Sequence, residues 1–512
     1  MVRFRLLTCA LFYWGAAAVS TAAPQDAGAA AARAYHRHHQ HDIVRELVEL
    51  LSIPNIATDT PNIRRNAEML KRMLEKRGVT VRLLPIEGRG PVVYGELRVP
   101  GAARTVLYYC HYDGQPTDAS RWTDSKPFEP ALRTDAIERG GMKTPFPEPG
   151  VRYEDDWRIY ARSASDDKSP IVAILTALDA LRTAGIPLAH NVKFLLDGEE
   201  EAGSPNLENV VNAHRALLAA DLLITADGPV HQSGRPLLFF GNRGVMDIAI
   251  TVYGPVRPLH SGHYGNWAPN PAMRLAQLLA TFKDAHGRVL VEGFYDDATP
   301  LSPREQKAVA ALPDNDAALM RELGFTRPEG GGKKLAALIN QPSLNIRGLR
   351  SAYTCEQSQN IVPTEAVASL DCRLVKNIDP KKQFDRIVAH VRKRGYYVTG
   401  AVPTAEERAK YPLLARVEYG GGYPAARTSM DLPAARALVR VAEAGLGEPV
   451  VQMPTLGGSA PMYIFEILKM PVIGVPIVNH DNRQHSEDEN LRLGHFWRGI
   501  ELFAAVLADL RW

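Results

Sequence analysis

The sequence predicts an α/β fold in which a mostly parallel sheet carries helices on both faces, with a second, inserted α+β unit. Two observations support this. Short apolar runs typical of buried strands alternate with amphipathic helical patterns, an order that favours parallel βαβ units. This alternation of strand and helix patterns stops near Pro236 and resumes with a helical pattern at Leu432. The chain of 512 residues is therefore expected to form one α/β domain interrupted by another.

The expected elements of the first domain follow in order along the chain. Its helices have apolar residues at helical spacing, and the one that ends at Ala184 has Pro170 in its first turn and Gly185 just beyond its end. The helices are 42–51, 62–77, 171–184 and 432–444, followed by a C-terminal helix with an apolar stripe from Leu493 to Leu510. The strands are 79–84, 92–97, 105–110, 192–196, 222–225 and 471–477.

The middle of the chain indicates a small α+β sandwich. Residues 246–253 alternate like a half-exposed strand, residues 271–283 and 382–393 have helical periodicity, and a glycine-rich strand is expected at 417–423. We therefore expect residues 42–237 and 429–512 to form one domain, and residues 238–428 to form the inserted one.

The N-terminus has the three-part order of a secretory signal. Arg3 and Arg5 precede an apolar run from Leu6 to Val19, and Ala22 ends a small-x-small cleavage pattern. We predict a signal peptide at 1–22, a flexible leader at 23–41, and an exported protein, periplasmic or secreted, with no membrane attachment after cleavage. The formal net charge of +3 is too balanced to favour nucleic acid as a partner.

Three cysteines remain after such a cleavage. In an exported protein an odd number leaves at least one free thiol, so a disulfide scaffold is not expected. The sequence leaves open whether Cys355 and Cys372 pair, and Cys110 is expected in the core.

Acidic and imidazole side chains follow four of the expected strands. His111 and Asp113 follow the third strand, Glu200 and Glu201 the fourth, Asp227 the fifth, and His485 comes after the last. The carboxyl ends of parallel strands form the ligand crevice of an open sheet, so these side chains can meet. Histidine and carboxylate without thiolate suit catalytic zinc or manganese.

Asp166 and Asp167 directly precede the helix at 171–184. An N-cap needs only one carboxylate, whereas two metals about 3.5 to 4 Å apart need a bridging one. Two roles are therefore open for Asp166: it bridges two metal ions, which is the more specific hypothesis, or it only caps the helix.

These residues fall into a series that resembles the motifs of the di-zinc metallopeptidase family of carnosinases, non-specific dipeptidases, glutamate carboxypeptidases and aminoacylases. The match spans nearly the whole chain after the leader, and its middle motif is most similar to the carnosinase and dipeptidase branch. The motifs are His111-x-Asp113, Ser165-Asp166-Asp167-Lys168, Glu200-Glu201-Ala202-Gly203-Ser204, Asp227, Leu259-His260-Ser261-Gly262, Gly457-Gly458-Ser459 and His485-Ser486-x-x-Glu489.

The resemblance implies a phosphorylase/hydrolase-like catalytic domain with an inserted lid and dimerisation domain. It implies two zinc ions, for which Mn2+ or Co2+ could substitute. It makes Glu200 the general base toward a metal-activated water, with Asp113 orienting His111. The implied metal ligands are His111, Asp166, Glu201, Asp227 and His485.

The lid is implied to complete the site. In the family the equivalent of His260 stabilises the oxyanion in the partner subunit's site, which implies a homodimer formed through the inserted domain. Arg373, with Asn360 and Ser459, resembles the set that holds the free carboxylate of a small peptide substrate.

The predicted function is hydrolysis of the amide bond of a dipeptide or of a C-terminal residue. An N-acyl-amino-acid deacylase needs the same chemistry, so the sequence does not separate the two. A non-catalytic metal or peptide binder would have no need of Glu200 beside the metal ligands.

Overall fold

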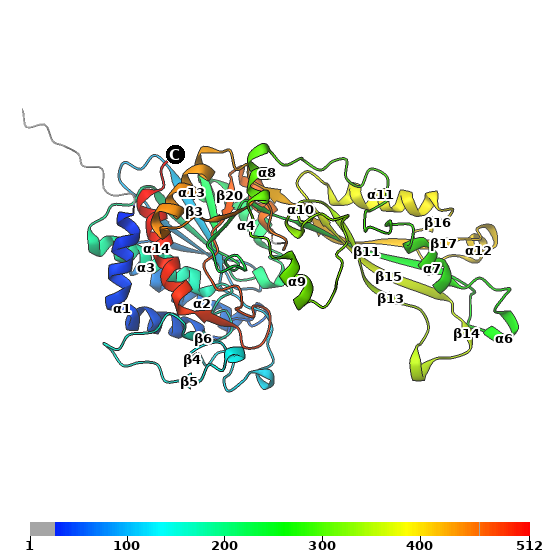
Figure 1. Cartoon of the computed structure of the whole chain (residues 1–512), viewed down its shortest axis with the longest axis horizontal. Helices are drawn as coiled ribbons and strands as arrows, with labels where there is room; N and C mark the ends of the chain where they lie inside the picture. The colour runs from blue at the N-terminus through cyan, green and yellow to red at the C-terminus, as the bar shows by residue number, and fades with distance from the viewer. Residues whose placement is uncertain (1–25, 460) are drawn as a thin grey trace, which may run out of the picture.

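The computed structural model describes residues 26–459 and 461–512. It has two parts: an α/β domain built around an eight-stranded sheet, and an elongated inserted domain that projects from it (Figure 1). The predicted fold class is confirmed. The predicted signal peptide at 1–22 lies outside the described residues, so export stays a prediction.

The eight-stranded sheet is mixed and mostly parallel at its centre. Its strand order is β1-β2-β7-β3-β8-β20-β9-β19, and β7, β3, β8 and β20 run parallel to one another. This order brings the carboxyl ends of neighbouring strands to one edge of the sheet. The strands are β1 (Thr80–Leu84), β2 (Val92–Leu97), β3 (Thr105–His111), β7 (Asn191–Asp197), β8 (Leu222–Thr225), β9 (Leu237–Phe239), β19 (Val451–Met453) and β20 (Val472–Gly474).

Helices cover both faces of this sheet. Strand β3 shows the alternation that makes this possible, because Tyr108 and Cys110 join one core and Leu107 and Tyr109 join another. The first core is covered by α1 (Ala27–Leu51), α2 (Thr60–Glu75), α3 (Lys168–Ala184), α13 (Pro433–Leu446) and α14 (Leu493–Asp509). The second is covered by α4 (Leu207–Ala213), α5 (Arg215–Leu218) and the 3-10 helix η5 (Pro461–Leu468).

Helix α1 corrects the expectation of a flexible leader at 23–41. From Ala27 onward this segment is helical, because alanine favours a helix and its small side chains allow close packing on α14. A Cβ on Gly28 would lie 2.6 Å from the carbonyl oxygen of Ala504. Buried His36 lies 3.0 Å from Glu501 and stacks on Trp497, so its side chain packs α1 against α14.

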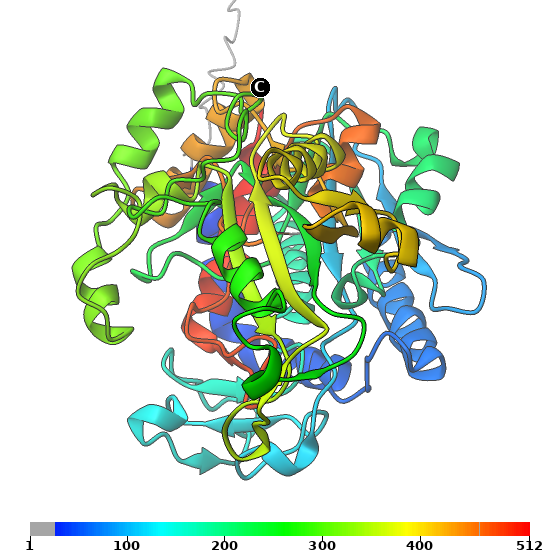
Figure 2. The same ribbon diagram turned by 90° about the vertical axis from the view of Figure 1, so that its right-hand side faces the viewer.

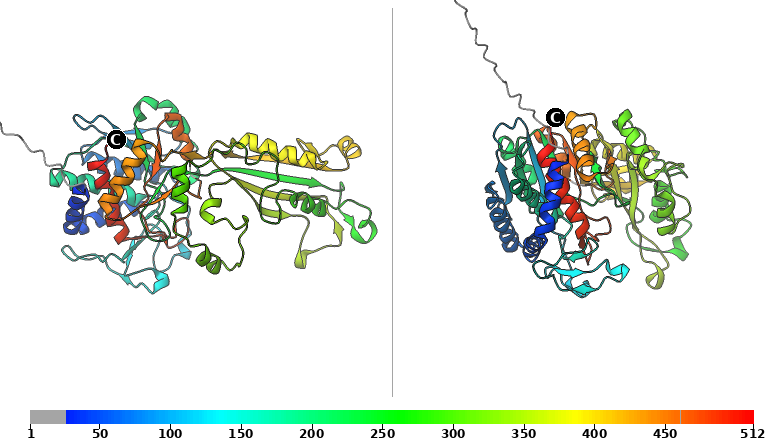
Figure 3. Two further views of the ribbon diagram at one scale, coloured as in Figure 1. Left: turned by 45° about the horizontal axis from the view of Figure 1, so that its top comes forward. Right: turned by 60° about the vertical axis from the view of Figure 1, so that its left-hand side comes forward.

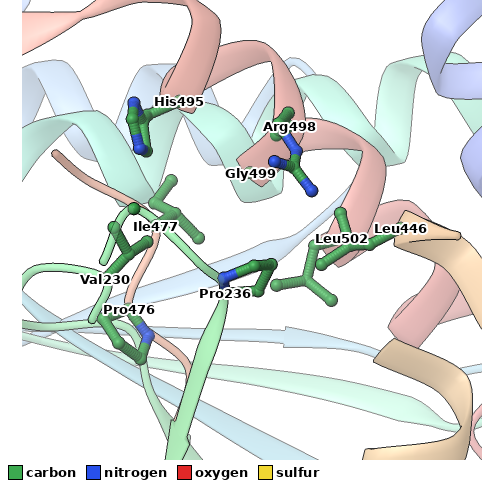
Figure 4. Close-up of a pocket in the computed structure, with 10 residues that line it drawn as sticks. Val230, Pro236, Leu446, Pro476, Ile477, His495, Arg498, Gly499 and Leu502 are labelled. Carbon is green, nitrogen blue, oxygen red and sulfur yellow. The ribbon is translucent and has the colours of Figure 1, made fainter. Parts of the chain in front are cut away.

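The other side of α14 borders a small apolar hollow, which Figure 4 shows between Ile477, Leu502 and Pro236. Its volume of about 20 Å³ is room for a single water. Burial lowers the pKa of His495 at its edge to about 4. No residue of the predicted site lines this hollow, which is too small for a peptide.

The inserted domain is a five-stranded sheet with helices on one side, as the side and end views show (Figures 2 and 3). Its strand order is β13-β15-β11-β17-β16, and α7 (Pro271–Leu279) and α11 (Pro380–Lys393) pack on its buried face. The strands are β11 (Gly244–Tyr253), β13 (Ser343–Arg350), β15 (Glu365–Leu374), β16 (Tyr397–Thr399) and β17 (Leu414–Tyr423). The other short helices of the inserted segment are α9 (Asp316–Glu322), α10 (Leu335–Leu338), η4 (Cys355–Gln357) and α12 (Ala405–Lys410). Helix α8 (Pro303–Ala310) also belongs to this segment but packs against β19 of the α/β domain.

Small sheets finish the structure. Strand β10 (Gly241–Asn242) pairs with β18 (Ala426–Arg427) where the two domains join. At the far end of the inserted domain β12 (Leu259–His260) pairs with β14 (Ile361–Val362) beside α6 (Ser261–Tyr264). A four-stranded sheet joins β4 (Ala131–Arg133), β5 (Lys143–Thr144), β6 (Arg158–Tyr160) and β21 (Asn490–Arg492), and the remaining 3-10 turns are η1 (Ala119–Arg121), η2 (Ile137–Arg139) and η3 (Glu200–Ala202).

Two further properties concern the described part of the chain. Its three cysteines are free, with Cys110 and Cys372 buried and Cys355 exposed, which answers the open question of a Cys355–Cys372 pair. Within residues 26–459 and 461–512, every helix is too short or too polar to span a bilayer.

Candidate metal and active site

The strand-end residues come together at one edge of the large sheet. His111 is the last residue of β3, where it pairs in register with Asp197 of β7, and Asp227 follows the neighbouring strand β8. Asp166 lies just before α3, and η3 after β7 carries Glu200 and Glu201. His485 arrives from the loop between β20 and β21, so segments far apart in the sequence meet here.

Asp166 joins two groups of potential metal ligands. Its Oδ1 lies 2.9 Å from His111 Nε2, and its Oδ2 lies 3.0 Å from His485 Nε2. One group consists of His111, Asp166 and Asp227, and the other of Asp166, Glu201 and His485, with ligand atoms within 4.8 Å of one another in each. A carboxylate with one oxygen toward each group has the arrangement that a bridging ligand needs.

The charges of this site are unbalanced without cations. Burial raises the pKa of Glu201 to about 7 and that of Asp227 to about 6, and neighbouring Asp166 adds to both shifts. Burial also raises the pKa of Glu200 well above its usual range. A hydrogen bond to Asp166 raises the pKa of His485 to about 9. This excess of buried carboxylates over histidines fits divalent cations as the missing partners.

Buried carboxylates hold the backbone that carries these side chains. Asp113 accepts hydrogen bonds from the backbone N–H groups of Glu200 and Glu201, each at 3.0 Å, and its carboxylate lies 3.4 Å from His111 Nδ1.

Glu489 accepts from the N–H groups of Ser163, Ser165 and Asp166 at 2.9 to 3.0 Å and pairs with Arg162 at 2.7 Å. Both carboxylates therefore position neighbouring groups.

The structure brings together two of the three residues expected to hold a carboxylate. Arg373, at the end of β15, donates to Ser459 Oγ at 2.7 Å across the junction of the two domains. Tyr423 of β17 stands beside Ser459, and the charges of both Glu200 and Arg373 influence its pKa, which burial raises. Arg373 and Ser459 therefore meet at the junction of the two domains.

Asn360 and His260 lie elsewhere. The carbonyl oxygen of Asn360 accepts from Ser261 N at 2.9 Å, which places Asn360 beside His260. Both residues are exposed at the far end of the inserted domain, next to α6 in Figure 1. Within one chain they are separated from the strand-end cluster, so the structure divides the predicted substrate set between two places.

Comparison with known proteins identifies the family. The model of Peptidase family M20/M25/M40 matches residues 107–509. The chain belongs to this family of metallopeptidases. The match includes the whole strand-end cluster and the inserted domain.

The family member resembles peptidases along most of its length. It is 25% identical over 491 residues to the Cys-Gly metallodipeptidase dug1 of Schizosaccharomyces pombe, covering 92% of this chain and 95% of that one. It is 26% identical over 432 residues to human Beta-Ala-His dipeptidase, covering 82% and 77%. Among solved structures it is similar to the M20 family metallo-carboxypeptidase Sso-CP2 of Sulfolobus solfataricus, with a TM-score of 0.73, 29% identity, and coverage of 92% and 99%. The predicted metallopeptidase of dipeptidase or carboxypeptidase type is confirmed.

Three polar residues of this peptidase site carried no assigned role in the sequence. Gln115 donates to Glu201 Oε2 at 2.7 Å, Glu489 anchors the backbone before α3, and Glu199 is buried against Asn206 and Arg89. Glu489 was visible only as the last letter of a motif, and its value appears when three N–H groups point at it. Gln115 lies two residues after Asp113, a spacing that signals the same side of an extended segment.

We expect the metal-free peptidase to lose stability as pH rises, because Asp227 keeps its proton to about pH 6 in the folded state against 3.8 when unfolded. A raised folded pKa contributes stability that is present below pH 4 and lost as pH rises through 6. Asp227→Asn removes this loss. In the presence of a chelator at pH 8, the free energy of unfolding of Asp227→Asn should exceed that of the wild type by about 1 to 2 kcal/mol. At pH 4 the two free energies should be equal.

The measurement is urea unfolding across pH 4 to 8. The matched control is Asp221→Asn, which lies at the opposite end of β8 and pairs with Arg104 at the surface. Parallel curves for wild type and Asp227→Asn would contradict the expectation.

Proposed function

We propose that this peptidase is a zinc-dependent exopeptidase that holds two metal ions and cleaves a dipeptide or releases a C-terminal residue. The observation that carries the proposal is the pair of ligand groups that share Asp166. Glu200 lies close enough to them that the charges of Asp227 and Asp166 add to the rise of its pKa. Its likeness to dipeptidases and to a carboxypeptidase supports the same reading. Manganese and cobalt accept the same ligands as zinc.

The residues divide the chemistry in a defined way. His111 and Asp227 would hold one ion, Glu201 and His485 the other, and Asp166 both. When bound, such ions lower the pKa of a water molecule and polarise a carbonyl group. A carboxylate oxygen of Glu200 takes the proton from the attacking water and returns it to the leaving amine. Asp113 holds the N–H of Glu200, which fixes where that carboxylate starts.

Replacing Glu200 tests its role as the base. Glu200→Gln keeps the size and polarity of the side chain, but its amide cannot take the proton of the attacking water, so kcat should fall about 100-fold or more. Metal content, measured by elemental analysis, should stay as in the wild type. Glu208→Gln, on the nearby helix α4, is the control and should keep full activity. Undiminished turnover of Glu200→Gln would refute the assignment.

Arg373 and Ser459 support a substrate with a free carboxylate. The guanidinium of Arg373 is only partly covered by protein, and its nearest carboxylate, Asp371, lies 3.5 Å from its Nε. The neighbouring Arg243 is buried, and burial together with the charge of Arg373 lowers the pKa of Arg243 to about 10. Two guanidinium groups beside one carboxylate leave a positive site that suits a peptide C-terminus.

A substrate panel tests this site. Wild type should hydrolyse dipeptides with a free carboxylate faster than the same dipeptides blocked as amides, and Arg373→Met should reduce that preference about 10-fold to 100-fold. Arg304→Met, which removes a surface ion pair on α8, should leave it unchanged.

N-acetyl amino acids belong in the same panel. Activity on them alone would replace the exopeptidase with the deacylase. Binding of metal without turnover of any member would favour a non-catalytic binder.

We further propose a homodimer in which His260 of one chain completes the site of the other. Its support is that β12, which ends at His260, pairs with β14 at the far end of the inserted domain, with Asn360 beside it, away from the metal ligands of their own chain. Trp267 is 82% exposed at this end, and Leu349 is 62% exposed on the edge strand β13. Exposed apolar side chains on a projecting arm are typical of a surface that another protein covers.

Mixing two inactive variants tests the sharing. If the sites are shared, His260→Ala and Glu200→Gln homodimers are each inactive, and a mixed dimer keeps one intact site. An equal mixture should then recover about a quarter of wild-type activity, because half the dimers are mixed and each has one working site. Verified mixed dimers without activity would contradict sharing, as would a monomer by analytical ultracentrifugation.

A further inference from the structure

Gln115 contacts Glu201 at the edge of the cluster. Its Nε2 donates to Glu201 Oε2 at 2.7 Å, and the same oxygen lies 3.3 Å from His485 Nε2. Gln115 is half-buried and comes four residues after His111 on the segment that leaves β3. One short segment thus carries His111, then Asp113, then Gln115.

This segment is fixed in place by its own contacts. Gly114 N donates to the carbonyl oxygen of Asn55 at 2.9 Å, and a Cβ on Gly114 would lie 2.3 Å from Ser163 Oγ. Because glycine has no side chain, this segment can pack closely against the loop before α3 that carries Ser163. Gln115 therefore starts from a rigid backbone and can hold a partner in a fixed direction.

Glu201 is the member of the cluster that most needs such a partner. Its side chain has one more rotatable bond than those of Asp166 and Asp227, and it projects from a 3-10 turn rather than from a strand end. Asp113 fixes its backbone N–H, but that contact does not set the direction of its carboxylate. The contact from Gln115 does.

We propose that Gln115 is a positioning residue that orients Glu201 and so sets the metal affinity of the group made by Asp166, Glu201 and His485, and not that of the other group. The proposal rests on the metal site proposed above. It assigns different supports to the two ions: Asp113 orients His111 in one ligand group, and an amide hydrogen bond from Gln115 orients Glu201 in the other. Removal of a partner that orients a metal ligand typically weakens binding about 10-fold to 100-fold.

The experiment is a metal titration of the full-length chain. Metal-free protein is titrated with Co2+ by visible absorption and with Zn2+ against a chromophoric chelator, for wild type and Gln115→Met, which keeps the length but not the donor. Gln452→Met is the matched control, because Gln452 is also half-buried but lies on β19 outside the cluster. His485→Ala and Asp227→Asn identify which equivalent belongs to which group.

Wild type should bind two equivalents. Gln115→Met should weaken, by about 10-fold to 100-fold, the equivalent that His485→Ala removes, and leave unchanged the one that Asp227→Asn weakens. The melting temperature of metal-free Gln115→Met should equal that of metal-free wild type. Unchanged affinities, an equal loss in both equivalents, a loss in the equivalent assigned to Asp227, or a wild type that binds fewer than two ions would each overturn the proposal.

The outcome is separate from the proposed function. Two equivalents with the expected selective loss, but no hydrolysis of any peptide, would leave the role of Gln115 standing and remove the exopeptidase. Hydrolysis with no selective loss would do the reverse.

Discussion

The carboxylate of Asp166 is the point on which the site depends. Hydrogen bonds with His111 and His485 hold its pKa well below the usual range despite burial, so below about pH 6 it stays charged while Glu201 and Asp227 are protonated. Its two oxygens tie a residue at the end of β3 to a loop near the C-terminus. Without that carboxylate the two ligand groups would have no common member.

Holding Asp166 in place requires further buried charge. Glu489 binds its N–H and those of Ser163 and Ser165, and Arg162 neutralises Glu489. A buried ion pair contributes little net stability compared with an apolar core, because desolvating both charges is costly, but breaking one partner away is strongly destabilising. Such a pair is understandable here, since the backbone before α3 must present its N–H groups to one carboxylate. The fold thus accepts the cost of a buried ion pair to fix the geometry of Asp166, which is itself buried.

Much of this could be predicted from the sequence, for physical reasons that also explain the failures. Strand ends of a parallel sheet converge, so the approach of His111, Asp227 and Glu201 follows from the order of elements. Packing between segments that lie far apart in the sequence leaves no comparable pattern in the sequence. The alanine- and glycine-rich composition of the stretch after Ala27 predicts a flexible leader, whereas this stretch is a helix that packs on α14, at the other end of the chain. Likewise Asn360 was grouped with Arg373 by motif, whereas strand pairing with β12 carries its neighbourhood to the tip of the inserted domain.

The two domains contribute different parts of the candidate site. All five residues of the two ligand groups come from the α/β domain, where parallel strands and buried carboxylates fix them. Arg373, Asn360 and His260 all come from the inserted domain, and of these only Arg373 touches the α/β domain, through Ser459. Binding of the proposed metal ions would therefore need no particular position of the inserted domain, whereas the proposed recognition of a substrate carboxylate would need the junction between β15 and the loop at Ser459 to be closed. A movement of the inserted domain would change which substrates bind before it changed whether metal binds, because the Arg373–Ser459 hydrogen bond crosses the junction and the contacts of Asp166 do not.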